Sequence, residues 1–260
     1  MKYELLEKYR DCLETFLSVE TARVYKNRLD YLLTDGSNIN PIKDFDINKV
    51  LLNLSKMKYK NYFSQAKNAL LYFCHWQKIL LSKEVYETIK DLESKTIKKN
   101  RKMPVMEMKK IENTINHLKN QKLKLSFQTM LKTGLRVSEL ANITPNNCTI
   151  EKTAINIYFI CKGSKFENIT IKKEDDTVFF ERLLKLISDT KKGKRIFYSA
   201  NYLQQKAKDY NFQCHDLRRA FAKIEYKKTK SKKAVAEKLK HQSITTTDIY
   251  LNSNVKIEGD

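Results

Sequence analysis

The sequence is poor in the features that mark several classes of protein. Only 5 of its 260 residues are glycine and 3 are proline, which excludes collagen-like and low-complexity chains. It contains no apolar run of the ~18 residues that a membrane-spanning helix requires. The first residues combine acidic side chains with interrupted hydrophobicity, so we expect neither a signal peptide nor a membrane partner.

Cysteine is also scarce, and its spacing carries no signature. The five cysteines, an odd number, form no CxxC pair and no disulfide framework, which predicts a reducing cytoplasm. The chain has no GxxxxGK(S/T) loop, no carboxylate cluster for two metal ions and no Cys/His ligand spacing. We therefore expect no metal and no cofactor.

Positive charge, by contrast, is abundant. The chain has 51 Lys and Arg residues against 30 Asp and Glu residues, a net charge of +21. Residues 191–240 hold 16 basic and 4 acidic side chains, and residues 95–102 hold 5 basic side chains and no acid. Nucleic acid binds such clusters favourably because counterions are released, whereas a membrane surface would require a basic amphipathic helix. The sequence therefore predicts a nucleic-acid partner, with a solvated lysine-rich surface as the alternative.

Hydrophobic periodicity divides the chain into two parts and a linker. Over residues 1–93, apolar residues recur at helical spacing and predict a small bundle of four helices. The third helix covers residues 47–54 with Asp46 as its N-cap, and the aromatic stripe of the fourth, over 59–76, is expected to be core. Residues 94–104 (SKTIKKNRKMP) are polar and basic, so we interpret them as an interdomain linker.

Residues 105–260 show a mixed pattern. Residues 153–171 are β-branched and alternating around a turn at 161–165, which predicts a β-hairpin. Helical patterns lie before and after the hairpin, at about residues 108–118, 123–132, 178–187, 202–210, 217–227 and 232–239. The expected fold is mainly α with a small β-sheet, a helical bundle followed by an α+β domain.

Three short segments in the second part carry candidate chemistry. They are TGLRVSEL, HDLRR and LKHQSITTTDIY. In the second segment, His215 and Arg218 share one helix face because residues three apart are neighbours on a helix. In the third, Tyr250 follows His241 by nine residues. Each segment alone has an ordinary structural explanation, such as a surface arginine or a capping histidine.

Together and in this order, the segments resemble the tyrosine recombinase (phage integrase) family, most strongly over residues 127–251. The resemblance implies an N-terminal helical core-binding (SAM-like) bundle and an α+β catalytic domain, in the two-domain layout of Xer and Cre recombinases. It also implies a set of catalytic residues, with Glu139 as an orienting carboxylate. The catalytic set is Arg136, Lys162, His215, Arg218, His241 and Tyr250.

The roles that the resemblance implies fit the residue types. Tyr250 is the nucleophile that forms a 3′-phosphotyrosine, although a tyrosine hydroxyl with a pKa near ~10 needs activation. Arg136 and Arg218 clamp the phosphate oxygens, and their charge becomes more valuable as negative charge grows in the transition state.

The remaining members of the set move protons. His215 takes the tyrosine proton, and His241 donates to a phosphate oxygen. Lys162, on the hairpin turn, protonates the departing 5′ oxygen, with Lys165 as the competing candidate. This chemistry conserves bond energy and requires neither ATP nor metal.

Two positions depart from this interpretation. Lys240 stands where most family members have glycine, and a left-handed helix end costs lysine more than glycine; alternatively, Lys240 contacts phosphate. Cys214, beside His215, allows a metal or thiol-nucleophile interpretation, which leaves Arg218 and Tyr250 unexplained.

The tail after Tyr250 is short. Related recombinases dock a C-terminal segment onto a neighbouring protomer, but the 10 residues here offer few apolar anchors. These anchors are Leu251, Val255 and Ile257. Exchange of the tail between protomers therefore stays open.

The resemblance also implies partners. It predicts a C-shaped clamp on duplex DNA, two protomers per site, four in synapsis through a Holliday junction, and accessory DNA-bending or directionality proteins, in the cytoplasm at the nucleoid. The expected DNA contacts are Lys98, Lys99, Arg101, Lys165, Arg219 and Lys240. The role is integration and excision of a mobile element or Xer-type resolution. Alternatives are a type IB topoisomerase-like enzyme, a DNA-binding protein with a decayed site, and a generic basic nucleic-acid binder.

Overall fold

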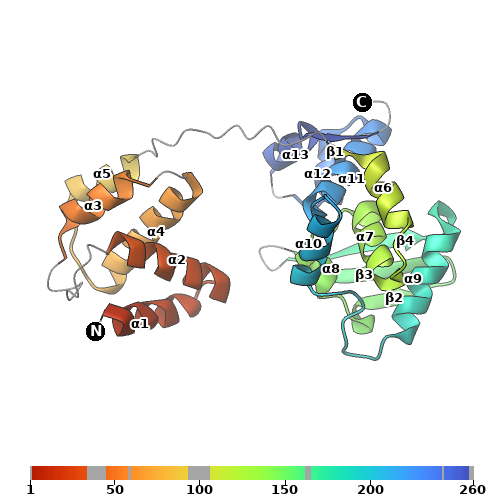
Figure 1. The fold of residues 1–260 in the computed structure, drawn as a ribbon, viewed down its shortest axis with the longest axis horizontal. Helices are drawn as coiled ribbons and strands as arrows, with labels where there is room; N and C mark the ends of the chain where they lie inside the picture. Colours follow the sequence, from red (N-terminus) through yellow and green to blue (C-terminus); the bar gives the residue numbers. More distant parts are fainter. Residues whose placement is uncertain are drawn as a thin grey trace. The chain divides into compact units, whose positions relative to one another are not determined.

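The computed structural model separates into two compact units, Met1–Arg101 and Lys102–Asp260 (Figure 1). The structure describes residues 2–33, 45–57, 60–92, 106–161, 165–241 and 243–257. The predicted linker 94–104, with its three expected DNA contacts, lies outside the described residues, as does Lys162. Each unit is described by itself below.

The N-terminal unit contains five helices among its described residues. They are α1 (Lys2–Glu14), α2 (Val19–Leu32), α3 (Ile47–Ser55), α4 (Lys60–Trp76) and α5 (Lys83–Asp91). The Asp46 side chain accepts hydrogen bonds from the backbone N–H groups of Asn48 and Lys49, which confirms the predicted N-cap of α3. The four predicted helices are present as α1 to α4, and the sequence analysis missed a fifth, α5. It is only nine residues long and fully buries only Ile89, so it carries few apolar positions to reveal it.

The N-terminal core is apolar and aromatic. Tyr9 and Phe73 are fully buried with their rings edge to face, 5.7 Å between centroids, and the Tyr9 hydroxyl donates to the Ala69 carbonyl at 2.7 Å. Most of the described aromatic stripe of α4 is buried, as predicted, because it faces α1 and α2. Tyr62 is the exception; it is exposed, with the Arg28 guanidinium 3.7 Å from its ring centroid.

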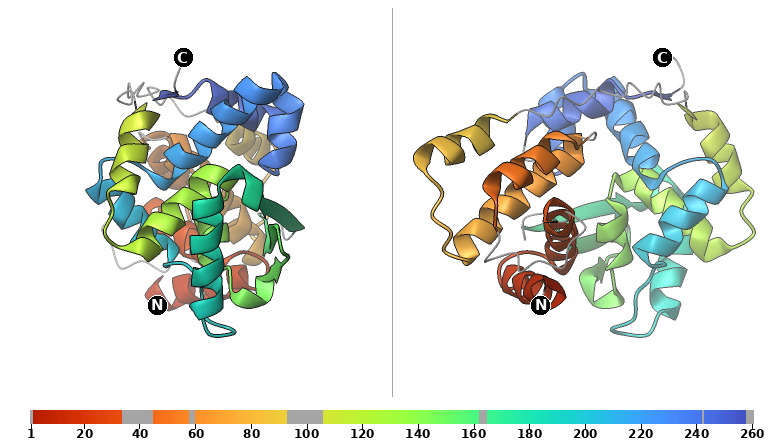
Figure 2. Two further views of the ribbon diagram at one scale, coloured as in Figure 1. Left: turned by 90° about the vertical axis from the view of Figure 1, so that its right-hand side faces the viewer. Right: turned by 60° about the vertical axis from the view of Figure 1, so that its left-hand side comes forward.

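The C-terminal unit is mainly helical with small sheets, which confirms the predicted fold class. Its helices are α6 (Met108–Asn116), α7 (Gln121–Thr133), α8 (Val137–Ala141), α9 (Thr177–Asp189), α10 (Ala200–Asp209), α11 (Cys214–Thr229), α12 (Lys232–Lys238) and α13 (Ile244–Leu251). Its strands are β1 (Met106–Glu107), β2 (Cys148–Ile150), β3 (Ala154–Ile160), β4 (Phe166–Lys172) and β5 (Val255–Lys256). Figure 2 shows α11, α12 and α13 side by side in blue.

The predicted hairpin forms two strands of a three-stranded antiparallel sheet in the order β2-β3-β4. Ile155 pairs with Ile171 and Ile157 with Ile169. Alternate residues of β3 are buried, since successive side chains of a strand point to opposite faces and one face packs on the core. Strand β2 was missed by the sequence analysis because three residues are too few to show alternation.

The tail after α13 is anchored to its own chain. Strand β5 pairs in parallel with β1, with Met106 opposite Val255 and Glu107 opposite Lys256. Val255 is fully buried and Ile257 nearly so, and both belong to the main hydrophobic core. Strand pairing and two buried apolar side chains therefore hold this short segment against the core of the C-terminal unit.

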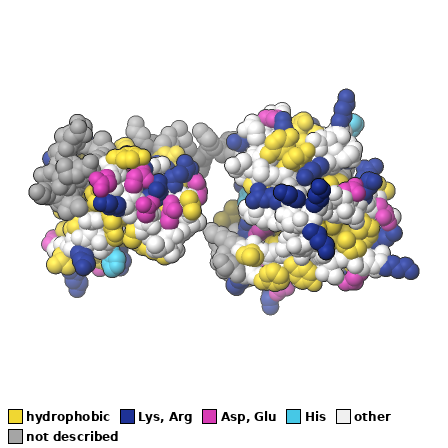
Figure 3. All heavy atoms as spheres, turned by 90° about the horizontal axis from the view of Figure 1, so that it is seen from below, with side chains coloured by type: hydrophobic (Ala, Val, Ile, Leu, Met, Phe, Trp, Pro, Cys, Tyr) yellow, Lys and Arg dark blue, Asp and Glu magenta, His cyan; other side chains and the backbone are white. Residues whose placement is uncertain are grey.

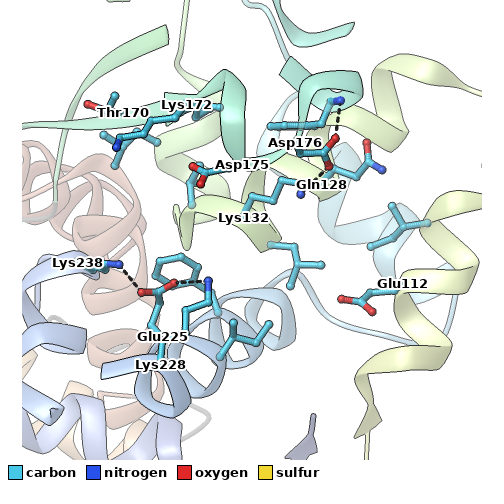
Figure 4. Close-up of a pocket in the computed structure, with 18 of the residues that line it drawn as sticks. Glu112, Gln128, Lys132, Thr170, Lys172, Asp175, Asp176, Glu225, Lys228 and Lys238 are labelled. Carbon is cyan, nitrogen blue, oxygen red and sulfur yellow. Dashed lines mark hydrogen bonds and ion pairs between the residues drawn. The ribbon is translucent and has the colours of Figure 1, made fainter. Parts of the chain in front are cut away.

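A pocket of about 750 Å³ opens beside β4, α7 and α11 (Figure 4). Its charged side chains are largely paired with one another. Lys132 lies 2.8 Å from Asp176, and Glu225 pairs with both Lys228 and Lys238. This pairing leaves little free charge for an anionic ligand. Within the described part of the chain, no helix is both long and apolar enough to span a membrane.

Candidate active site

The three chemical segments of the sequence meet in one place. Arg136 lies at the start of α8, His215 and Arg218 in the first turns of α11, His241 just after α12, and Tyr250 within α13. We call these five residues the Tyr250 cluster. They are brought together because α13 packs against both α11 and α12, and α7 packs against α11.

Gly134 allows Arg136 to approach α11. It ends α7 in the left-handed conformation, with φ of 69°. A Cβ atom on this glycine would lie 2.5 Å from Phe221 Cδ1 and 2.8 Å from Leu239 Cδ2. Glycine alone satisfies both the backbone conformation and the close approach. The glycine of the TGLR segment therefore sets the position of the arginine that follows.

Glu139 holds Arg136 at two points. One carboxylate oxygen accepts from the Arg136 backbone N–H at 2.7 Å, and the other accepts from its guanidinium at 2.6 Å. The Glu139 side chain is only 4% exposed, and its first oxygen also lies 3.9 Å from the Arg218 guanidinium. This geometry suits the orienting role expected for Glu139.

Arg218 is the buried centre of the cluster. Its guanidinium donates to the Gly134 carbonyl and, at 2.5 Å, to the Leu239 carbonyl, so it joins the ends of α7 and α12. Its Nε is buried without a hydrogen-bond partner among the described residues. Burial lowers the pKa of Arg218, and the Arg136 charge lowers it further. Two guanidiniums share the Glu139 carboxylate, so the cluster keeps an uncompensated positive charge that favours an anion.

Tyr250 lies on the other side of the cluster, with its hydroxyl 2.8 Å from His215 Nε2. The side chain is 6% exposed and packs on a small apolar group that includes Phe221, Val235 and Leu239. The tyrosine is therefore held rigidly, with its hydroxyl within proton-transfer distance of an imidazole.

His215 is poised to act as a base. Surrounding protein atoms desolvate the ring and lower its pKa from 6.5, and the charges of Arg219 and Arg218 lower it further, although the residue keeps an exposed side. An imidazole with a pKa below 6.5 is mostly neutral at pH 7, and a neutral Nε2 can accept the Tyr250 proton.

The turn that carries His241 is built on a left-handed lysine. Lys240 has φ of 53°, and its N–H bonds to the Glu237 carbonyl while the His241 N–H bonds to the Ala236 carbonyl. This is the pattern that usually selects glycine at the left-handed position, as expected from the sequence. The Lys240 ammonium lies 2.9 Å from a carboxylate oxygen of Glu167 on β4. In the protein alone, Lys240 is therefore engaged in an internal ion pair.

The His241 ring faces both the tyrosine and the arginines. Its centroid lies 4.8 Å from that of Tyr250, and Nδ1 lies 2.8 Å from the Thr247 hydroxyl. Nε2 is buried without a partner in the described part of the chain. Burial lowers the pKa of His241 to about 4, with help from the charges of Arg218 and Arg136. The ring is therefore neutral at pH 7.

Two further predicted residues lie outside the Tyr250 cluster, although Arg219 is close enough for its charge to lower the pKa of His215. Arg219 donates to Asp216 at 2.9 Å, and Lys165 is exposed at the start of β4. Cys214 is buried and burial raises its pKa to about 12, so its thiol stays protonated and the thiol-nucleophile interpretation gains no support. No group of three His, Cys, Asp or Glu residues suited to a metal occurs within the described ranges.

Thr247 is the residue that sequence reasoning missed. It lies near the start of α13, which begins at Ile244 with Ser243 as its N-cap. A signal was present, because Thr247 precedes Tyr250 by three residues and must share its buried helix face. The cluster as a whole combines a hydroxyl nucleophile, a neutral base and an anion-binding pair of arginines, which suits attack on a phosphodiester.

Comparisons with known proteins agree with this geometry. A model of the phage integrase family matches residues 101–256. The curated tyrosine recombinase XerH of Campylobacter jejuni is 30% identical over 60% of this chain and 49% of that protein. The chain thus spans about half the length of this relative.

Solved structures show the same fold at low identity. XerH bound to its difH substrate, in a pre-cleavage complex, matches with a TM-score of 0.63 and 19% identity over 90% of this chain and 78% of that chain. A dimer of lambda integrase(75-356) bound to a COC' core site matches with a TM-score of 0.67 and 15% identity over 96% and 95%. A lambda integrase tetramer bound to a Holliday junction gives a TM-score of 0.68 and 14% identity over 97% and 77%.

Proposed function

This chain belongs to the phage integrase family of tyrosine recombinases, and from this membership we propose that it is a site-specific DNA recombinase. It cuts and rejoins duplex DNA through a 3′-phosphotyrosine intermediate. The observation that carries the proposal is the Tyr250 hydroxyl 2.8 Å from His215 Nε2, beside two arginines that retain an uncompensated charge.

In the first step, the Tyr250 oxygen attacks the phosphorus of the scissile phosphate. His215 takes the phenolic proton, the new bond joins tyrosine oxygen to phosphorus, and the bond from phosphorus to the 5′ oxygen breaks. The leaving 5′ oxygen receives a proton from Lys162, with Lys165 as the competing donor.

The rest of the cluster stabilises the charge that develops on the phosphate. Arg136 and Arg218 each present guanidinium N–H groups suited to bidentate contact with phosphate oxygens. His241 adds a hydrogen bond from Nε2. A free 5′ hydroxyl from either duplex then reverses the reaction, so that strand exchange needs no ATP.

DNA binding rests on the basic surface. Lys and Arg side chains gather on one face of the C-terminal unit (Figure 3). We assign residues 1–93 to a core-binding domain, 94–104 to a linker whose lysines and arginine contact phosphates, and 105–260 to the catalytic domain. Affinity should therefore fall steeply with salt, because phosphate contacts release counterions.

Assembly is proposed by analogy with the solved relatives. Lambda integrase has been solved as a dimer on a core site and as a tetramer on a Holliday junction. We infer a dimer of this chain on each site and a tetramer in synapsis. Accessory DNA-bending or directionality proteins, a cytoplasmic location at the nucleoid, and a role in mobile-element transfer or Xer-type resolution complete the proposal.

Covalent trapping tests the chemistry. The protein is mixed with randomly nicked genomic DNA of its source, denatured in detergent, and the DNA that remains attached is sequenced. Wild type should give adducts at one repeated motif, Tyr250→Phe should give none, and Tyr210→Phe, which alters a tyrosine outside the cluster, should match wild type.

The outcomes separate the alternatives. Adducts without joining of two separate sites would favour a topoisomerase-like enzyme. DNA binding without any adduct would contradict the catalytic proposal and favour a decayed site. If that binding also shows no preference for any DNA sequence, the result would favour a generic basic binder, because a decayed site keeps its sequence preference.

A further inference from the structure

Thr247 is a buried polar residue with one hydrogen-bond partner. It is fully buried on α13, and its hydroxyl lies 2.8 Å from His241 Nδ1. The adjacent residues Thr245 and Thr246 face outward, exposed and partly exposed respectively. Thr247 is therefore distinguished from its neighbours by burial and by its contact with the imidazole.

The direction of this hydrogen bond follows from counting protons. A threonine hydroxyl carries one proton, and a buried donor left without an acceptor costs about 1–3 kcal/mol. Among the described residues, the hydroxyl of Thr247 has His241 Nδ1 as its partner. If Nδ1 carried the ring proton and donated, the hydroxyl proton would have no acceptor. A hydroxyl that donates to an unprotonated Nδ1 places the ring proton on Nε2, and an acceptor at Nε2, such as a phosphate oxygen, then satisfies both donors.

We propose that Thr247 is a positioning residue that donates to His241 Nδ1 and thereby keeps the ring proton on Nε2, where it meets the scissile phosphate. Nε2 is the buried ring nitrogen that lacks a partner in the described part of the protein. The assignment of phosphate as its ligand rests on the proposed function, and so does the preference for this tautomer, because an acceptor at Nε2 is what satisfies the ring proton.

The surroundings of the ring favour a neutral donor. Arg218, Arg136 and His215 all lower the pKa of His241, and the Tyr250 ring packs against it. A neutral ring has two tautomers, and only the one protonated on Nε2 offers a hydrogen bond to an anion. Without a fixed tautomer, part of the population would present a lone pair to the phosphate.

Thr247 also links this tautomer to the nucleophile. It precedes Tyr250 by three residues on α13, so both side chains point from the same face of one helix. Any displacement of α13 that withdraws the Tyr250 hydroxyl also withdraws the hydroxyl of Thr247. One rigid element therefore positions the nucleophile and prepares the phosphate donor.

Nitrogen NMR tests the tautomer directly. The chain has only 4 histidines, so protein labelled with ¹⁵N-histidine gives a simple long-range proton–nitrogen spectrum, and His241→Gln assigns the signals. We expect His241 to show an unprotonated Nδ1 and a protonated Nε2 at pH 7. A protonated Nδ1 would overturn the proposal.

Substitutions then test whether Thr247 determines the tautomer of His241. Thr247→Val, similar in shape but without a hydroxyl, should change the Nδ1 shift and raise the pKa of His241, because the lost bond stabilised the neutral ring. Thr247→Ser should preserve both values, and Thr246→Val is the matched control. An unchanged Nδ1 shift and pKa in Thr247→Val would contradict the role. If Thr247→Val does not fold, the wild-type and serine spectra still decide.

Adduct formation on the nicked genomic DNA gives the functional readout. Thr247→Val should slow it about 10-fold, a part of the effect of a whole catalytic donor, and Thr247→Ser should restore most of the rate. Wild type without adducts but with the expected tautomer would defeat the proposed function alone. Normal adducts with the opposite tautomer would defeat this inference alone.

Discussion

In the N-terminal unit, the side chains buried among the described residues are apolar or aromatic, whereas those of the C-terminal unit include charged and polar groups. The buried polar set is Ser126, Thr129, Thr133, Glu139, Asp216, Arg218, Glu225 and Thr247. All of these belong to the unit Lys102–Asp260. The ion pairs of the N-terminal unit lie at its surface, as Arg23 with Glu20, or are partly buried, as Lys26 with Glu7.

This difference separates a unit whose interior mainly provides stability from one whose interior also provides chemistry. Burial of a charge costs several kcal/mol before it is paired, so a buried arginine beside a second arginine contributes little to stability. The same arrangement suits a site that must receive a phosphate. Substitutions in the two interiors should therefore have different consequences for stability and for cleavage.

The largest effect is expected for Arg218→Ala. It removes one of the two guanidiniums and leaves the Gly134 and Leu239 carbonyls without their donor. Adduct formation should fall at least about 10²–10³-fold, and the C-terminal unit should lose about 3–5 kcal/mol of unfolding free energy. Trapping assays and urea unfolding followed by circular dichroism measure the two effects. Arg219→Ala, which removes a partly buried guanidinium paired with the buried Asp216, should lower adduct formation less than Arg218→Ala does.

A core substitution in the N-terminal unit should lower the stability of that unit without affecting the catalytic residues of the C-terminal unit. Phe73→Ala opens a cavity in the apolar core and should lower the unfolding free energy of the N-terminal unit by about 3–5 kcal/mol. Trp76, the single tryptophan, lies with its ring centroid 6.2 Å from that of Phe73, so its fluorescence reports on this unit. Arg218→Ala should leave the tryptophan transition in place. A changed His241 tautomer in Phe73→Ala would contradict the separation.

Acid should destabilise the C-terminal unit selectively. The pKa of His241 is lowered to about 4 in the folded protein, whereas the unfolded chain titrates near 6.5. The unfolded state thus binds more protons, and stability falls as the pH falls from about 6.5 towards 4, by about 3 kcal/mol in total. His241→Gln should remove this part of the slope in unfolding curves taken across that range. If the stability of the N-terminal unit, followed by Trp76 fluorescence, falls with pH by the same slope, the assignment of this slope to His241 would be contradicted.

The smallest effect concerns left-handed lysines after helices, for which one residue is taken from each unit. Lys78 and Lys240 have φ of 52° and 53°. Glycine removes a strain of about 1–2 kcal/mol, reduced by its own greater chain entropy. Lys78→Gly should therefore stabilise its unit by about 1 kcal/mol.

Lys240→Gly provides the contrast. It should gain less stability, because it also loses the ion pair with Glu167, which is worth at most about 1 kcal/mol. Thermal unfolding of the two variants compares the gains. A larger gain for Lys240→Gly than for Lys78→Gly would show that this ion pair contributes nothing.

Much of the local structure follows from the sequence. Asp46 predicts the start of α3, and the alternation of β3 and β4 predicts their hairpin. Both could be predicted because caps and strand alternation depend on neighbours along the chain. The order of Arg136, the His-x-x-Arg pair, His241 and Tyr250 likewise indicated the family before any contact was known. Short elements, such as α5 and β2, were missed because they contain too few residues to show a pattern.

What the sequence determined by itself is therefore the succession of elements and the identities of the candidate residues. Only the tertiary structure decided that His215 and Tyr250, 35 residues apart, share a hydrogen bond, and that Arg218 reaches the Gly134 carbonyl across 84 residues. It also decided that Thr247 faces His241. Caps, turns and alternation depend on the nearest residues, whereas burial and the lack of a partner depend on how distant segments pack, which no local pattern encodes.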